Sequence, residues 1–185
     1  MTVKEKLPLD TPRVEVRKPL TLAGLRKRYN SKIVTNIPSL WRELHPYWAK
    51  VTVRTGKGAF GLVLDMNNAE GFDYFAGFEV SSDKNLPAEI LVIKVPAQEY
   101  AIFAHRGHVS EIRDTMSAIW REWLPSSEYQ VAFGSGKTPD AMEHYGEAFN
   151  PQTGMGDIEI WIPIRNREQT CEEKTNGRTT YCSGN

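Results

Sequence analysis

The sequence has little cysteine, no excess of either charge and no long hydrophobic run. Both of its cysteines, Cys171 and Cys182, lie in a polar stretch after Arg165, which excludes a disulfide framework for a core and leaves them as expected free thiols. The 23 basic residues balance the 23 acidic ones, so net charge attracts the chain neither to a nucleic-acid backbone nor to an anionic membrane. Apolar stretches are strand-sized and broken by charge, and the start lacks the apolar core of a signal peptide. We therefore expect a cytoplasmic protein with no direct nucleic-acid binding and no membrane contact.

The length of 185 residues suits one folded domain rather than two. Residues 1–12 are charged and carry two prolines, while residues 166–185 are polar and short of large apolar side chains. Such compositions cannot repay the entropy lost when a chain is ordered. We predict a flexible arm at 1–12, a folded domain at 13–165 and a disordered tail at 166–185.

Two tryptophan-bearing segments indicate an internal repeat. Leu40-Trp-Arg-Glu-Leu-His-Pro46 matches Ile119-Trp-Arg-Glu-Trp-Leu-Pro125 at a constant offset of 79 residues. A duplicated module of nearly that length explains the match. The two copies are predicted at about 13–81 and 89–165.

Each copy contains one predicted amphipathic helix, because apolar residues around Trp41 and Trp120 recur at the spacing of a single helical face. Asn36 can cap the first helix. Pro46 and Pro125 predict similar helix ends, because proline cannot continue a helix.

The remaining apolar segments alternate with polar residues as strands do. An apolar strand pair around a turn precedes each helix, at 14–28 and at 89–105. Two further strands follow each helix, at 59–66 and 72–81 in the first copy and at 141–149 and 157–164 in the second. The sequence thus predicts an α+β fold: a duplicated strand-helix-strand module with pseudo-twofold symmetry, in which two main helices pack on one side of an antiparallel sheet.

Several motifs favour structural roles. Gly56-Lys-Gly-Ala-Phe-Gly-Leu-Val63 fits nucleotide-binding glycine patterns, but a predicted strand follows it instead of a helix, so we expect a turn. His105, His108 and His144 have no acidic or thiol partner at a metal-ligand spacing, so we expect packing or loop hydrogen bonds and no metal. We expect no cofactor, and no serine or cysteine has an obvious neighbouring base.

The last two strands carry the most informative pattern. In Ala141-Met-Glu-His-Tyr145, alternation places Glu143 and Tyr145 on one face. In the following strand the isoleucines form an apolar face, most simply the one beneath the helices, which leaves Trp161 on the other. Tyr74 and Phe78 play the similar part in the first copy.

A carboxylate on a central strand of an apolar sheet is costly unless a partner compensates, and a ligand cation could be that partner. Neighbouring aromatic rings would add cation–π attraction of about 0.5 to 2 kcal/mol each. The alternative is that Glu143 accepts backbone or tyrosine hydrogen bonds, or is simply exposed.

Four segments, in this order and spacing, resemble the GyrI-like family, whose fold is that of the effector-binding domain of AraC-type and multidrug-responsive bacterial transcription activators. These segments are Tyr100-Ala-Ile-Phe-Ala-His-Arg-Gly107, Ile119-Trp-Arg-Glu-Trp-Leu-Pro125, Pro139-Asp-Ala-Met-Glu-His-Tyr145 and Ile158-Glu-Ile-Trp-Ile-Pro-Ile164. The resemblance implies a groove between two repeats that takes hydrophobic, often cationic, molecules. It also implies that the ligand-contacting glutamate of the family falls on Glu143, with Tyr145, Trp161, Tyr74 and Phe78 around it.

Three functions follow as expectations. The first is a stand-alone binding domain for amphipathic, cationic small molecules, which acts as a sensor, a sequestering agent or a partner in transcription regulation. The second is enzymatic, because some relatives look like hydrolases of cyclopropane-bearing compounds, where Glu143 would activate water. The third is a protein-interaction role like that of relatives associated with gyrase inhibition.

Overall fold

A computed structural model of the chain describes residues 9–30, 32–66, 69–132 and 138–167. Its strands are β1 (Arg13–Arg17), β2 (Leu20–Tyr29), β3 (Ala59–Leu64), β4 (Phe72–Glu79), β5 (Leu91–Val95), β6 (Gln98–His105), β7 (Tyr129–Val131), β8 (Ala141–Tyr145) and β9 (Ile158–Asn166). Its helices are α1 (Ile37–Leu44), α2 (Tyr47–Lys50), α3 (Ile112–Ala118) and α4 (Leu124–Ser126). Short 3-10 turns precede α1 and α3, and a π-helical segment, Ile119–Trp123, joins α3 to α4.

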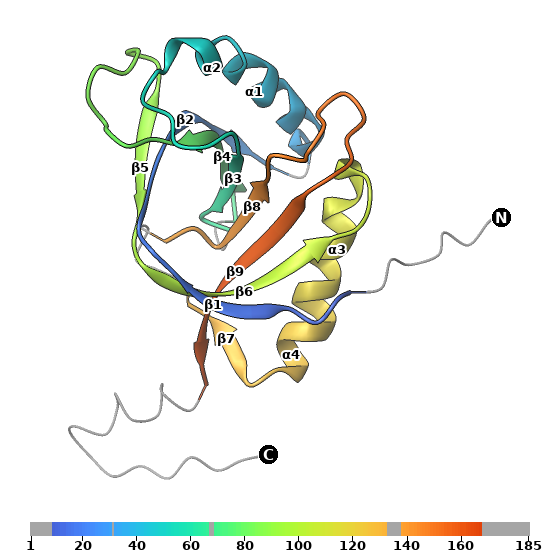
Figure 1. Cartoon of the computed structure of the whole chain (residues 1–185). Coiled ribbons are helices and arrows are strands. Elements are labelled where there is room, and N and C mark those ends of the chain that lie inside the picture. The colour runs from blue at the N-terminus through green and yellow to red at the C-terminus, as the bar shows by residue number, and fades with distance from the viewer. Residues whose placement is uncertain (1–8, 31, 67–68, 133–137, 168–185) are drawn as a thin grey trace, which may run out of the picture.

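The strands form one nine-stranded antiparallel sheet in the order β1-β6-β9-β8-β3-β4-β2-β5, with β7 paired to β9. If β1, β2, β3 and β4 are matched with β5, β6, β8 and β9, this order reads the same from both ends. The centre of the order is the β3–β8 pair, so a pseudo-twofold axis passes through that pair. The predicted α+β fold with a duplicated module is confirmed (Figure 1).

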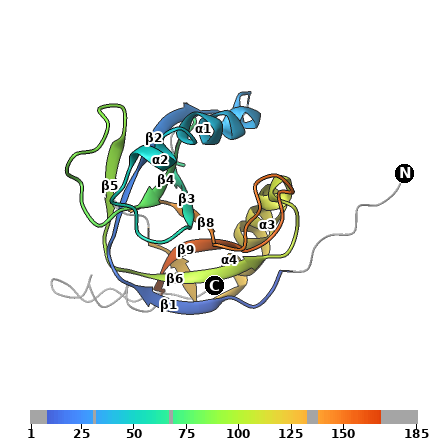
Figure 2. The ribbon, with the colours of Figure 1, turned by 45° about the horizontal axis from the view of Figure 1, so that its top comes forward.

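The two strands predicted before each helix are present, but they do not pair with each other as a hairpin would. β1 pairs with β6, and β2 pairs with β4 and β5, so each half lends its first strand to the other half. The connections run through Pro19 and Pro96, which have no backbone N–H to donate in a hairpin ladder. The sheet is therefore strongly curved, with β2 and β5 in one wall and β1 and β6 in another (Figure 2).

The two faces of the sheet bury different apolar clusters. The helix-side cluster contains Leu40 and Leu44 of α1 together with Ile112 and Ile119, packed on the isoleucines of β9. The opposite-face cluster contains Phe60, Leu62, Met142 and Trp161 and others. The prediction that the isoleucines at 158, 160, 162 and 164 lie beneath the helices is confirmed, because all four belong to the helix-side cluster.

The helix ends differ in part from expectation. Asn36 occupies the cap position of α1, but its side chain makes no capping hydrogen bond. The second helix does not end at Pro125, because α4 extends to Ser126. The π-helical segment, in which the N–H of Leu124 bonds to the carbonyl of Ile119, interrupts the α pattern just before this proline. Pro125 thus lies in a first turn, where a missing N–H is tolerated.

The described chain continues slightly past the predicted domain end at 165. β9 reaches Asn166, and Arg167 donates hydrogen bonds to the backbone carbonyls of Tyr129 and Leu124. The rest of the predicted tail, with Cys171 and Cys182, lies outside the described residues. Within the described part of the chain, no helix has the length and apolar character needed to cross a membrane.

Candidate functional site

The centre of the sheet brings together Glu143 on β8 and Gly61 on β3. These two residues face each other in the antiparallel β3–β8 register, with two paired residues on either side. The pseudo-twofold axis therefore passes between them. A carboxylate stands on one side of the axis and a glycine on the other.

Gly61 leaves the space that the carboxylate occupies. A Cβ atom at Gly61 would lie 2.7 Å from Oε2 of Glu143 and closer still to the hydroxyl of Tyr74. Any larger residue would displace one of these groups. The sequence predicted only a turn followed by a strand in this segment, and the role of Gly61 becomes visible only with the strand register.

Two tyrosines donate hydrogen bonds to the same oxygen of Glu143. The Tyr74 hydroxyl lies 2.5 Å from Oε2, and the Tyr145 hydroxyl lies 2.8 Å from it. All three side chains are buried, and Glu143 exposes 8% of its surface. Among the residues that the structure describes, none hydrogen-bonds to Oε1 and no lysine or arginine forms an ion pair with Glu143.

Burial sets the electrostatics of this group. Desolvation raises the pKa of Glu143 above its ordinary value, while the hydrogen bonds from Tyr74 and Tyr145 and a smaller electrostatic effect of the His105 ring act in the opposite direction. The pKa values of both tyrosines are raised well above 10.0 by burial and by the neighbouring carboxylate. The phenols therefore stay protonated as donors, and the carboxylate is the group that titrates.

Aromatic rings cover this buried triad on the helix side. Trp41 of α1 packs edge-on against Tyr145 with ring centroids 5.2 Å apart, and against Tyr74 at 6.5 Å. Phe149 lies 4.9 Å from Tyr145, and Tyr29 lies 6.3 Å from Tyr74. Trp41 was predicted only as part of the apolar helical face. The helical spacing of the apolar residues around Trp41 placed it on the buried face, but its contact with Tyr145 depends on how α1 packs on the sheet.

Phe78 shares the helix side of the sheet but packs elsewhere. Its ring lies 5.4 Å from that of Trp48, and the guanidinium of Arg54 lies over both rings, at 4.5 Å from Trp48 and 5.7 Å from Phe78. The chain thus supplies its own cation to this aromatic pair. Phe78 is not brought into contact with Glu143.

Trp161 lies on the opposite face from Glu143. It pairs in register with Met142, whereas Glu143 pairs with Ile160. Its ring packs against Phe60, His144 and Tyr100 and beneath the guanidinium of Arg17. The prediction that Trp161 and Glu143 lie in one cluster is therefore wrong. Alternation along each strand does not fix the register between strands.

Glu159, next to Trp161, is ionised and well paired on that opposite face. It accepts hydrogen bonds from Trp161 and Arg13. Burial acts to raise its pKa, but His144, Trp161 and Arg13 together lower the pKa to about 2. The contrast with Glu143 is clear. Two glutamates of neighbouring strands lie on opposite faces: Glu159 pairs with the guanidinium of Arg13, whereas the described donors to Glu143 are two neutral tyrosine hydroxyls.

The three histidines considered for a metal site, His105, His108 and His144, make packing and loop contacts. The His105 ring lies 2.8 Å from the Thr115 hydroxyl and 3.0 Å from the His108 carbonyl, while His108 caps the turn before α3. His144 packs between Phe60 and Trp161. Across the described residues, no group of three or more potential ligands could hold a metal ion.

Comparison with known proteins adds sequence and fold relationships. The family described as the GyrI-like small molecule binding domain matches residues 10–165. The transcriptional regulator BrlR of Pseudomonas aeruginosa is 26% identical over 154 residues, which cover 82% of this chain and 54% of BrlR. The chain thus spans about half the length of this relative.

Solved structures share the fold at low sequence identity. SAV2435, whose structure was determined bound to tetraphenylphosphonium, has a TM-score of 0.67 and 17% identity, over 85% of this chain and 96% of its own. The EcmrR C-terminal domain has a TM-score of 0.60 and 17% identity, over 85% and 98%. An integron cassette protein of Vibrio cholerae has a TM-score of 0.60 and 19% identity, over 85% and 97%.

The substitution Glu143→Gln is expected to leave the ligand-free fold as stable as wild type, or to stabilise it, at neutral pH. It removes a buried charge and keeps an oxygen that can accept from Tyr74 and Tyr145. Because the folded-state pKa of Glu143 is raised, its contribution to stability is present below the ordinary value of 4.5 and is lost as pH rises through the folded-state value. Urea denaturation of both proteins should show an advantage of the variant that grows with pH. An advantage that is constant with pH would contradict this assignment.

The substitution Gly61→Ala is expected to destabilise the fold by about 1 to 3 kcal/mol, because its Cβ overlaps the Tyr74 hydroxyl and Oε2 of Glu143. Gly58→Ala is the matched control, since its Cβ would meet its nearest atoms at 3.1 and 3.2 Å. Urea denaturation at neutral pH measures both. Equal losses for the two variants would show that Gly61 makes no special room for the carboxylate.

Proposed function

The chain belongs to the GyrI-like small molecule binding domain family, and we propose that it captures hydrophobic cations at Glu143 on the helix side of the sheet. The observation that carries this proposal is a buried carboxylate held by two neutral donors, with no ion pair to a described lysine or arginine. A buried charge without an opposite charge is costly. A bound cation would supply the missing partner.

The aromatic rings around Glu143 support a cation with apolar substituents. Trp41 packs against both Tyr74 and Tyr145, the two residues that donate hydrogen bonds to the carboxylate. Each ring face that meets a desolvated cation adds about 0.5 to 2 kcal/mol of attraction. We propose Tyr74, Tyr145 and Trp41 as ligand contacts, whereas Phe78 packs against Trp48 and Trp161 lies on the opposite face of the sheet.

The position of the site favours entry between the two halves of the chain. Glu143 lies on the central strand pair, while α1 of the first half and α3 of the second cover the same face of the sheet (Figures 1 and 2). We propose that the ligand lies in a groove between these helices. Trp41 is half-buried and contacts both tyrosines, so it would have to shift as a ligand enters.

The biological role is proposed to be that of a sensor or sequestering domain in regulation. BrlR is a transcriptional regulator, and the chain matches about half of it. A capture domain could act through a protein partner or by lowering the free ligand concentration. Both roles depend on the same binding event.

Tetraphenylphosphonium is expected to raise the melting temperature of the protein, whereas tetraphenylborate, of the same shape and opposite charge, is not. Ligands that bind only the folded state stabilise it by mass action. SAV2435 provides the precedent for this cation. Glu143→Gln should abolish most of the shift, and differential scanning fluorimetry measures it.

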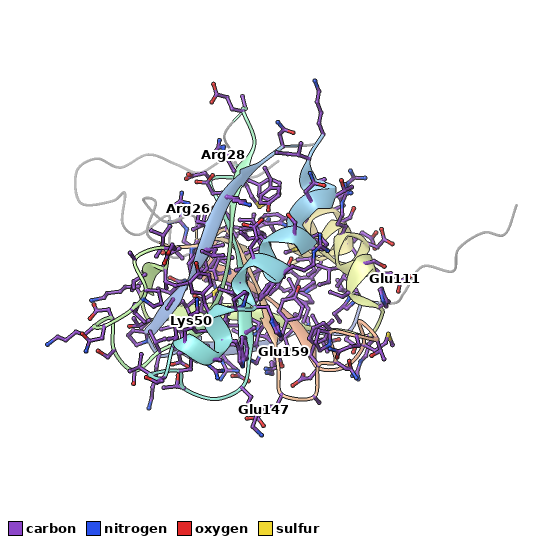
Figure 3. The ribbon with its side chains drawn as sticks, turned by 90° about the horizontal axis from the view of Figure 1, so that it is seen from above. Arg26, Arg28, Lys50, Glu111, Glu147 and Glu159 are labelled. Carbon is purple, nitrogen blue, oxygen red and sulfur yellow. The ribbon has the colours of Figure 1, made fainter. Side chains whose placement is uncertain are left out.

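Glu147→Gln is the matched control, because Glu147 is exposed and extends from the rim of the molecule (Figure 3). It should keep the full shift. Equal shifts with both tetraphenyl ions, or a full shift in Glu143→Gln, would sink the proposal.

The raised pKa of Glu143 also suits a general base, so product formation from a cyclopropane-bearing compound, lost in Glu143→Gln, would favour the hydrolase alternative.

The affinity for tetraphenylphosphonium is expected to fall as pH is lowered through the pKa of Glu143. This pKa is raised above 4.5, and the cation pairs only with the ionised carboxylate. Calorimetric titrations from about pH 4 to about pH 8 should show a loss of affinity that begins above the ordinary glutamate range. An affinity that does not change with pH would exclude the carboxylate as the charge partner.

A further inference from the structure

The two oxygens of Glu143 have different surroundings. Oε2 accepts hydrogen bonds from the Tyr74 and Tyr145 hydroxyls, at 2.5 and 2.8 Å. No residue in the described part of the chain donates to Oε1. Because a carboxylate oxygen can accept about two hydrogen bonds, Oε2 has no acceptor position left, whereas Oε1 can still accept hydrogen bonds.

The surrounding protein fixes this difference. Tyr145 comes from the same strand as Glu143, and Tyr74 reaches Oε2 across the space left by Gly61. Both tyrosines are buried and packed against Trp41, so they cannot turn easily to share Oε1. The site therefore presents one acceptor that the neighbouring chain leaves to a ligand.

We infer that the Glu143 site prefers cations that carry an N–H, such as protonated tertiary amines, over quaternary cations of the same shape. This inference rests on the proposed function and specifies its ligand class. An N–H can donate a charge-assisted hydrogen bond to Oε1, whereas a quaternary centre is surrounded by carbon and cannot donate.

The two effects of N-methylation oppose each other. Removing the N–H forfeits a hydrogen bond to an ionised acceptor, which is worth about ten- to a hundredfold in affinity. The added methyl group raises the affinity about fourfold, because it buries more apolar surface. The hydrogen bond is larger, so the protonated amine is expected to bind about tenfold more tightly.

The test is a calorimetric comparison of diphenhydramine, a tertiary amine with two aromatic rings, and its N-methyl quaternary salt. The titrations are made at neutral pH, where both ligands are cations and differ by one methyl group. Tighter binding of the amine supports the inference. Equal binding, or tighter binding of the quaternary salt, overturns it.

Glu143→Gln provides the internal control. Its amide oxygen accepts from the two tyrosines, which places the amide NH₂ where Oε1 stood, so an N–H of the ligand meets a donor. Both cations should weaken, and the amine should lose its advantage. An advantage that survives in Glu143→Gln would assign the preference to another acceptor and overturn the inference.

The outcomes separate the two proposals. If neither ligand binds, and tetraphenylphosphonium does not bind either, the proposed function itself fails and the inference fails with it. If all three cations bind but the quaternary salt binds at least as well as the amine, only the inference fails. The affinity ratio of the matched pair is therefore the decisive quantity.

Discussion

The hydrogen bonds from Tyr74 and Tyr145 hold a carboxylate at the centre of a nine-stranded sheet, and much of the local structure depends on keeping that group buried. The glycine at position 61 clears its space, and Trp41 covers its donors. Neutral donors soften the desolvation penalty without removing it, as the raised pKa of Glu143 shows. In the ligand-free fold, the buried carboxylate therefore has no ion pair with a described lysine or arginine.

The duplicated fold makes this site asymmetric. The β3–β8 register relates Gly61 to Glu143 and Val63 to Tyr145 about the pseudo-twofold axis, so the polar members of the triad come mainly from one side. A symmetric pair of glutamates would place two buried carboxylates in contact, where one pKa would rise further. Divergence between the two halves is therefore what allows a single charged centre on the axis.

Hydrophobic period and the internal repeat were enough to predict every described strand except β7, the two main helices and the face that the helices cover. Alternation also put Glu143 and Tyr145 on one face, and the structure joins them by a hydrogen bond. What could not be predicted depends on pairing between distant segments. Trp161 was misgrouped because register between β8 and β9 is a tertiary property, and Trp41 was missed because helix docking is another. The exchange of first strands between the two halves also leaves no periodic signal in the sequence.

That exchange of first strands has a consequence for how the chain folds. Arg13 pairs with Ile102, so β1 has no partner until the second half of the chain has been synthesised. β5, in turn, completes the edge beside β2 of the first half. Contacts between residues so distant in sequence slow folding, because the entropy of loop closure is lost before these contacts can stabilise the structure. Neither half is expected to be stable alone, and the nascent chain would carry exposed strand edges, a target for chaperones, until the halves interlock.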